Sequence, residues 1–105
     1  MKITILIFTG FLLTGDVIAA NETESMDVSR KHGCIACHHP DIKVVGPGWN
    51  EITSKYIVGQ VDVVEVLASR IRKGSKGVWG DLPMPPNTTI TDEEIRTLLR
   101  FVLTK

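Results

Sequence analysis

The chain has 105 residues, with 12 Lys plus Arg against 12 Asp plus Glu, so its formal net charge at pH 7 is zero. This balance excludes the strongly basic surface that nucleic-acid binding requires, and it gives no support for docking by long-range electrostatic steering alone. A domain of this size buries little apolar surface, so we expect an additional source of stability.

The N-terminal segment has the pattern of a secretory signal peptide. A cationic residue precedes an apolar run at 3–13, and small residues close the segment. The run is shorter than the roughly 20 residues that span a bilayer, so we expect cleavage after Ala20 or Ala19 rather than a retained anchor. The sequence therefore predicts that residues 1–20 are removed. Residues 21–105 then form a single domain in the periplasm, with no stable membrane insertion.

The mature chain begins with a predicted short helix over 25–32, with Ser25 as its N-cap and Gly33 as its C-terminal stop. The next residues, 34–38, read C-I-A-C-H, and C-x-x-C-H is the spacing of covalent haem attachment. Because a helical turn has about 3.6 residues, the thiols of Cys34 and Cys37 lie on one side and can each add to a haem vinyl group. The imidazole of His38 can then bind the iron from one face.

Turn residues over 40–47 predict a loop, and the Gly46-Pro47-Gly48 run indicates a close approach of the backbone to another group. Apolar spacing predicts a helix over 49–58. A third helix is predicted over 62–73, with one face made by Val63, Val66, Leu67, Arg70 and Ile71.

Residues 74–87 are rich in Gly and Pro and have no periodicity, so we expect an ordered loop that wraps one face of the haem. The last helix begins at a predicted capping box of Thr91 and Glu94. Its apolar stripe consists of Ile95, Leu98, Leu99 and Val102. No segment alternates like a strand, so the fold class is all-α.

The face of the iron opposite His38 needs a second ligand. His32 and His39 are too close to the attachment site to reach around the ring, and Met26 belongs to the first helix. Met84 lies far along the chain between two prolines, which fix the backbone on either side of it. We therefore interpret Met84 as a ligand, although a methionine alone is more often a gap-filling core residue.

With these motifs in this order, the chain resembles the class I cytochromes c, in particular the small bacterial cytochrome c-551 and c-552 type. The resemblance covers nearly all of the mature chain and rests on residues 31–38, 45–47, 70–71, 74–80, 83–87 and 92–94. It implies a small cytochrome c fold, with about four short helices and loops wrapped around one covalently bound haem.

The same resemblance implies the site residues. Cys34 and Cys37 would carry the two thioethers, and His38 and Met84 would be the axial ligands of the iron. The carbonyl of Pro47 would accept the Nδ1 proton of His38.

Three more residues would surround the haem by the same resemblance. Arg70 and Trp79 would hydrogen-bond a propionate, and Asn87 would steady the sulfur of Met84. Each has a purely structural alternative, respectively a snorkelling cation, a core aromatic and a turn residue.

Three positions depart from the usual pattern. Ser29 stands where such proteins often carry an aromatic that packs on the last helix, and Phe101 stands where tryptophan is usual. The crossing of the first and last helices is then expected to rely on residues Val28, Ile95 and Leu99. His39 is an unusual neighbour of the ligand, and we expect it to face solvent.

The predicted function is that of a soluble, monomeric one-electron carrier of a respiratory chain, not an enzyme. By the resemblance, a quinol-oxidising complex would reduce it, and a nitrite reductase, terminal oxidase or peroxidase would accept its electron. Partners would meet the haem edge beside Ile35, Ala36 and residues 44–48.

Two other functions remain as alternatives. A haem enzyme or gas sensor would need Met84 to be labile. A zinc or thiol-redox module would use Cys34 and Cys37 with His32 or His39, but a zinc site needs four ligands and a thioredoxin-like site needs a βαβ frame.

Overall fold

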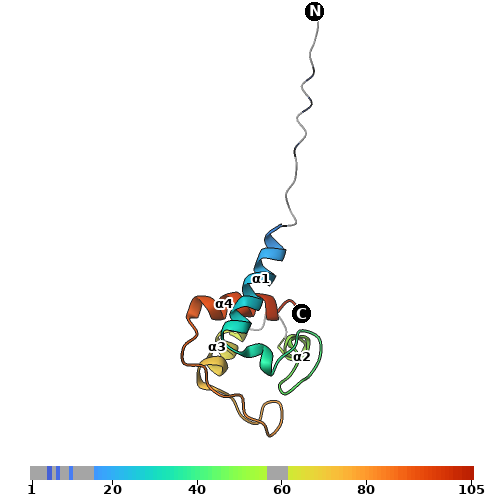
Figure 1. Cartoon of the computed structure of the whole chain (residues 1–105). Coiled ribbons are helices and arrows are strands. Elements are labelled where there is room, and N and C mark those ends of the chain that lie inside the picture. The colour runs from blue at the N-terminus through green and yellow to red at the C-terminus, as the bar shows by residue number, and fades with distance from the viewer. Residues whose placement is uncertain (1–4, 6, 8–9, 11–15, 57–61) are drawn as a thin grey trace, which may run out of the picture.

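The computed structural model describes residues 5, 7, 10, 16–56 and 62–105, with the backbone alone at 16–21. Within these residues it contains α1 (Asp16–Lys31), the 3-10 turn η1 (Cys34–Ala36), α2 (Trp49–Lys55), α3 (Val63–Lys73) and α4 (Asp92–Val102) (Figure 1). The described part of the chain has no strand, and its β-type pairing is limited to two isolated bridges, His38 with Lys43 and Ser75 with Met84. The all-α prediction is confirmed.

None of the helices in the described ranges is both long and apolar enough to cross a membrane.

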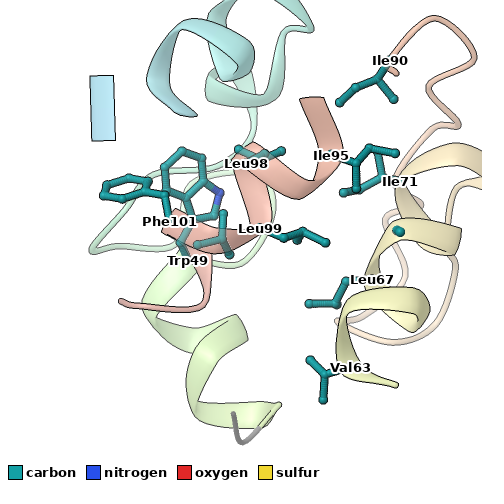
Figure 2. Close-up of a cluster of buried hydrophobic side chains, with 11 residues drawn as sticks. Trp49, Val63, Leu67, Ile71, Ile90, Ile95, Leu98, Leu99 and Phe101 are labelled. Carbon is teal, nitrogen blue, oxygen red and sulfur yellow. The ribbon is translucent and has the colours of Figure 1, made fainter. Parts of the chain in front are cut away.

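The centre of the core is the apolar face of α4. Its buried side chains are the four of the predicted stripe and one more: Ile95, Leu98, Leu99, Val102 and Phe101. Figure 2 shows this face between α3 on one side and Trp49 of α2 on the other. The rings of Trp49 and Phe101 meet edge to face, with centroids 5.7 Å apart. Burial of an aliphatic side chain of this size contributes roughly 1.5–3 kcal/mol, so α4 organises the small domain.

The first helix crosses α4 through two small residues. Ser25 and Ser29 are both 0% exposed, and the hydroxyl of Ser25 donates to the carbonyl of Thr97 at 2.7 Å. The prediction that Ser25 caps this helix is therefore wrong, because α1 begins at Asp16 and Ser25 lies inside it. No Gly or Pro interrupts residues 16–31, so nothing in the local sequence forces a start at Ser25. Val28 packs on the core as expected.

The middle helices differ from prediction at their ends. α2 ends at Lys55, followed by Tyr56 in an extended conformation, and the rest of that predicted helix lies outside the described residues. In α3 the buried side chains are Val63, Leu67, Ala68 and Ile71. Val66 is exposed, because the stripe that packs on α4 follows the four-residue spacing of Val63, Leu67 and Ile71.

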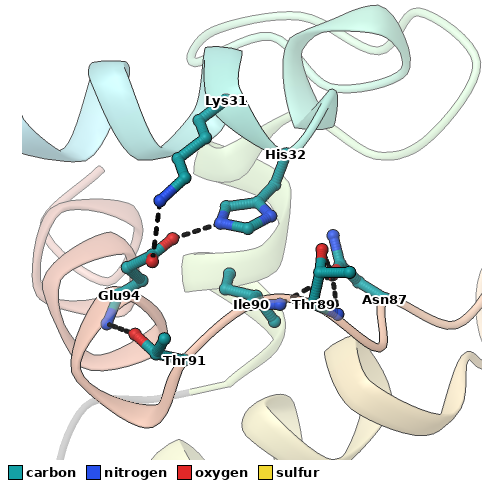
Figure 3. A network of polar contacts seen from close by, with 7 residues as sticks. All are labelled: Lys31, His32, Asn87, Thr89, Ile90, Thr91 and Glu94. Carbon is teal, nitrogen blue, oxygen red and sulfur yellow. Dashed lines mark hydrogen bonds and ion pairs between the residues drawn. The ribbon is translucent and has the colours of Figure 1, made fainter.

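The end of α1 and the start of α4 are joined by a polar cluster, drawn in Figure 3. The hydroxyl of Thr91 accepts a hydrogen bond from the Glu94 N–H at 3.1 Å, which is half of the predicted capping box. The carboxylate of Glu94 does not complete the box, because it pairs with the imidazole of His32 and with Lys31 Nζ, the latter at 3.1 Å. The hydrogen bond to His32, and then that to Lys31, lowers the pKa of the Glu94 carboxyl.

Candidate haem-binding site

An apolar cavity of about 640 Å³ lies between the C-x-x-C-H segment, residues 43–47, the loop 75–85 and the inner faces of α3 and α4. Seven of the eight predicted site residues line it, six of them being Cys34, Cys37, His38, Pro47, Arg70 and Trp79. Met84 lines it as well, and only Asn87 does not. The volume falls within the roughly 300–1,000 Å³ of typical cofactor pockets. The structure therefore brings distant parts of the sequence to one cavity.

The imidazole of His38 is oriented by the backbone that follows it. Its Nδ1 lies 2.7 Å from the carbonyl oxygen of Pro47, and a carbonyl only accepts, so Nδ1 carries the proton. The other ring nitrogen, Nε2, is then left with its lone pair, which is the form of histidine that binds a metal.

The close approach predicted for the glycine-proline run is confirmed at Gly46. A side chain at this position would meet the His38 ring at 2.7 Å. The Gly46 N–H also donates to the Cys37 carbonyl at 2.7 Å. Gly46 is thus needed where the loop passes directly over the imidazole.

The two cysteines lie at the ends of a tight turn. The amides of Cys37 and His38 both donate to the Cys34 carbonyl, at 3.2 and 2.9 Å. Burial, followed by the proximity of Cys37, raises the pKa of the Cys34 thiol. Reactive thiols of redox enzymes have lowered pKa values, so this environment does not favour the thiol-redox alternative.

In the described residues, no group of three or more His, Cys, Asp or Glu could hold a metal ion, so the zinc alternative has no support there.

Met84 is held by backbone pairing with Ser75. The amide of each residue donates to the carbonyl of the other, at 3.0 and 2.9 Å. Gly74 makes this pairing possible, because it has φ +78° and a side chain there would lie 2.7 Å from the Met84 carbonyl. The thioether is half-buried and packs against the core at the cavity wall. The loop is thus ordered around Met84, as predicted.

Arg70 and Trp79 reach the cavity from α3 and from the loop. The guanidinium of Arg70 donates to the hydroxyl of Tyr56, and none of the carboxylates in the described part of the chain forms an ion pair with it. Trp79 is partly exposed, and Lys55 Nζ lies 4.7 Å from its ring centroid.

Asn87 holds a turn. Its side-chain oxygen accepts from the backbone amides of Thr89 and Ile90, at 3.1 and 3.0 Å (Figure 3). The backbone N–H of Asn87 donates to the Ile71 carbonyl at 2.8 Å. The structure places this residue beside the loop that carries Met84 but not on the cavity wall. His39 is exposed, as expected, and its Nδ1 accepts from the Asp41 amide at 3.0 Å.

Sequence reasoning did not identify part of the site. The aliphatic wall made by Leu67, Ile71, Leu98, Leu99 and Val102 was predicted only as helix core. Lys55 and Tyr56, which contact Trp79 and Arg70, were missed because only the fold brings them near the cavity.

The residues present fit a covalently attached haem. Two free thiols, an imidazole with an available nitrogen and a thioether line one apolar cavity, and Arg70 offers a cation that no described carboxylate neutralises. An all-α fold with C-x-x-C-H on the wall of such a cavity defines a haem protein of the c type.

The cytochrome c family profile matches residues 26–105, and the chain belongs to this family. It is 38% identical over 94 residues to cytochrome c-552 of Nitrosomonas europaea, covering 90% of each chain. It is 43% identical over 96 residues to cytochrome c-551 of Pseudomonas aeruginosa, again covering 90% of each. The crystal structure of wild-type Nitrosomonas europaea cytochrome c552 matches with a TM-score of 0.70 at 43% identity, over 75% of this chain and 96% of that one.

The chain is therefore a small class I c-type cytochrome, an electron-transfer protein rather than an enzyme. Cytochromes c bind one haem c covalently through cysteines, and this sequence has two cysteines, Cys34 and Cys37. The alternative of a haem enzyme or gas sensor is not what its relatives indicate.

Proposed function

We propose that this cytochrome is an exported, soluble one-electron carrier whose iron is held by His38 and Met84. The observation that carries the proposal is the convergence of Cys34, Cys37, His38 and Met84 on one cavity. When bound, haem c supplies an iron that alternates between the ferric and ferrous states. With His38 and Met84 both holding the iron, no position on it would be left for a substrate.

The protein's contribution is orientation and exclusion of water. The Pro47 carbonyl holds the imidazole of His38 in one tautomer, and the Ser75 pairing holds the thioether of Met84 in place. A thioether ligand and the aliphatic wall both favour the ferrous state, and so raise the reduction potential. Because His38 and Met84 are fixed by backbone contacts, little rearrangement accompanies electron transfer.

Electrons would pass through the cavity rim beside the cysteines. Ile35 and Ala36 are exposed there, as are Val44 and Val45, and Leu82 on the opposite loop is 72% exposed. Pro47 and Gly48, which the sequence also placed at this surface, are buried, so the exposed part of this loop ends at Val45. A small apolar rim suits the short-lived contacts of redox partners. We assign a quinol-oxidising complex upstream and a nitrite reductase, terminal oxidase or peroxidase downstream.

The proposal includes export to the periplasm with removal of residues 1–20. Its support is the leader pattern of the sequence. Intact-mass measurement of the mature protein from a periplasmic extract should show cleavage after Ala20 or Ala19 and the added mass of one haem. A protein that keeps residues 1–20 would contradict export by cleavage.

The ligand assignment is tested by Met84→Ala in protein matured by a host that attaches haem. We expect the haem to stay attached and the reduced variant to bind carbon monoxide. Its reduction potential should fall by on the order of 0.1 V or more, since axial ligands span about 0.8 V.

Met26→Ala is the matched control, because Met26 packs on the core without lining the cavity. It should leave the potential and the carbon monoxide response unchanged. A Met84→Ala variant with the spectrum and potential of the wild type would remove Met84 from the iron. Cys34→Ala should abolish the normal double attachment, which haem staining after denaturation reports.

A further inference from the structure

The last residue of α2, Lys55, and the C-cap that follows it, Tyr56, each contact one of the two residues expected at the haem propionates. Tyr56 contacts Arg70, whose guanidinium donates to the phenol oxygen and lies with its central carbon 5.3 Å from the centroid of the phenol ring. Tyr56 does not itself line the cavity, whereas Arg70 does. The phenol therefore acts on the cavity only through Arg70.

Lys55 makes the corresponding contact with the loop. Its Nζ lies 4.7 Å from the Trp79 ring centroid and 3.4 Å from the Val78 carbonyl, to which it donates. An ammonium over an indole ring is an attractive cation–π contact, and the added hydrogen bond ties the backbone beside Trp79 to α2. Consecutive residues of one helix end thus hold side chains from two different elements.

We propose that Lys55 and Tyr56 are positioning residues that hold Trp79 and Arg70 toward the haem propionates and so set the pH dependence of the reduction potential. The inference rests on the proposed function, because it needs haem in this cavity. It adds to that function two residues that neither contact the iron nor line the cavity.

The physical reason lies in the five N–H donors of a guanidinium. Tyr56 occupies part of the Arg70 fork. Because one N–H meets the phenol oxygen while the guanidinium carbon lies over the phenol ring, the remaining donors are held in one direction. A fixed cation of this kind favours the ionised form of a nearby carboxylate and lowers its pKa. Without Tyr56 the Arg70 side chain can leave the cavity wall, and the carboxylate binds its proton more tightly.

Proton binding and iron reduction are linked by charge. A carboxylate near the iron holds its proton more tightly when the iron is ferrous, because the centre then carries one positive charge less. The potential therefore falls with rising pH across the interval in which the carboxylate titrates. Weaker pairing with Arg70 moves this interval to higher pH.

The test is redox titration between pH 4 and pH 9 of haem-loaded wild type, Tyr56→Phe and Lys55→Met. We expect Tyr56→Phe to move the pH-dependent interval upward by about half to one pH unit, a three- to tenfold change in the acid dissociation constant. Lys55→Met should move it in the same direction by less, since its ammonium is exposed. The other charged residues at the cavity, Lys43, Lys76 and Asp81, are the same in every protein compared.

Two controls separate positioning from stability. Thr53→Val removes another hydroxyl of α2, one that donates to the Val102 carbonyl at 2.6 Å. Lys105→Met removes another cation–π contact, with Nζ 4.8 Å from the Phe101 centroid. Both should lower the unfolding temperature without moving the pH profile of the potential.

The experiment separates failure of the positioning role of Lys55 and Tyr56 from failure of the proposed electron-carrier function. If wild type has no haem c bands, or binds carbon monoxide, the proposed function fails. If wild type behaves as a six-coordinate carrier and Tyr56→Phe keeps its pH profile, only the positioning role is overturned. A profile moved equally by Thr53→Val would also overturn it, since the effect would then follow stability.

Discussion

The imidazole of His38 is fixed from two sides by main-chain atoms of one short loop. Pro47 accepts its Nδ1 proton, and Gly46 lies so close that even a methyl group would overlap the ring. Orientation of the proposed iron ligand is thus encoded in two consecutive backbone positions, Gly46 and Pro47, rather than in another side chain. This explains why the run Val45-Gly46-Pro47 is informative in the sequence.

Gly46→Ala tests this account at the level of one atom. The added Cβ would meet the ring at 2.7 Å, and overpacking of this kind costs about 1–3 kcal/mol. We expect the haem-loaded variant to unfold at lower urea concentration and its His38 ring protons to shift in the NMR spectrum. Unchanged stability together with an unchanged ring environment would show that the loop does not constrain the imidazole.

Asn87 makes the contacts of a turn residue, which was the structural alternative to its proposed role beside Met84. Its side-chain oxygen is engaged by the turn at Thr89 and Ile90, so the purely structural reading describes the contacts that the structure contains. A role toward the Met84 sulfur remains a prediction. It would fall to the amide nitrogen of the side chain, because the oxygen is already occupied.

The pairing of α1 with α4 involves two small side chains, Ser25 and Ser29, of which Ser29 stands where the resemblance led us to expect an aromatic. Ser25 and Ser29 allow the helices to approach closely, but they differ in their hydrogen bonding. The hydroxyl of Ser25 reaches the Thr97 carbonyl, whereas the buried hydroxyl of Ser29 has no partner in the part of the chain that the structure describes.

This difference predicts stability changes of opposite sign. Ser25→Ala should destabilise the protein by about 1 kcal/mol through loss of a buried hydrogen bond. Ser29→Ala should stabilise it by about 1 kcal/mol, because it removes a buried polar group that is unsatisfied. Urea unfolding of the two haem-loaded variants at neutral pH measures both. A loss of stability in both would mean that the Ser29 hydroxyl is satisfied in solution.

The cluster of Glu94 with His32 and Lys31 links the same two helices and predicts a pH dependence. The pKa of Glu94 is lowered in the folded state, so its stabilising effect is complete above the unfolded value of about 4.5. The effect is lost as the pH falls through the lower, folded pKa. The side chain of His32 is only 5% exposed, and it serves as a structural partner of Glu94.

Glu94→Gln should therefore be less stable than wild type at pH 7, and the difference should shrink below pH 4 as the wild-type carboxylate is protonated. Glu93→Gln is the matched control, since Glu93 lies in the same first turn but is exposed. Urea unfolding at the two pH values compares them. A Glu94→Gln difference that is the same at both pH values would rule out the ion pair as its source.

At the scale of the whole molecule, the sequence predicted the elements that carry strong periodic or covalent signals. The stripe of α4 and the C-x-x-C-H turn are such signals, and both are where they were expected. The predicted start of α1 was wrong because the helix continues upstream of Ser25. The sequence alone does not distinguish a serine that caps a helix from a serine that is buried against another helix. Propensity alone does not separate these.

Some of the residues that line or support the cavity were predicted from the sequence and others were not, for a related reason. His38 and Met84 stand out because rare residue types occur in distinctive local patterns. Tyr56, Lys55 and the aliphatic wall have ordinary local patterns, and their relation to the cavity exists only after α2, α3 and α4 have packed. The resemblance supplied roles for Arg70 and Trp79, while the structure added the residues that hold them.

The central claim is a six-coordinate electron carrier, and the most direct test is the optical spectrum of the haem-loaded wild type. It would be recorded oxidised, reduced, and reduced under carbon monoxide. The account predicts sharp reduced bands of haem c that the gas does not move, because His38 and Met84 occupy both axial positions. A clear shift on addition of carbon monoxide would show an open iron and contradict the account.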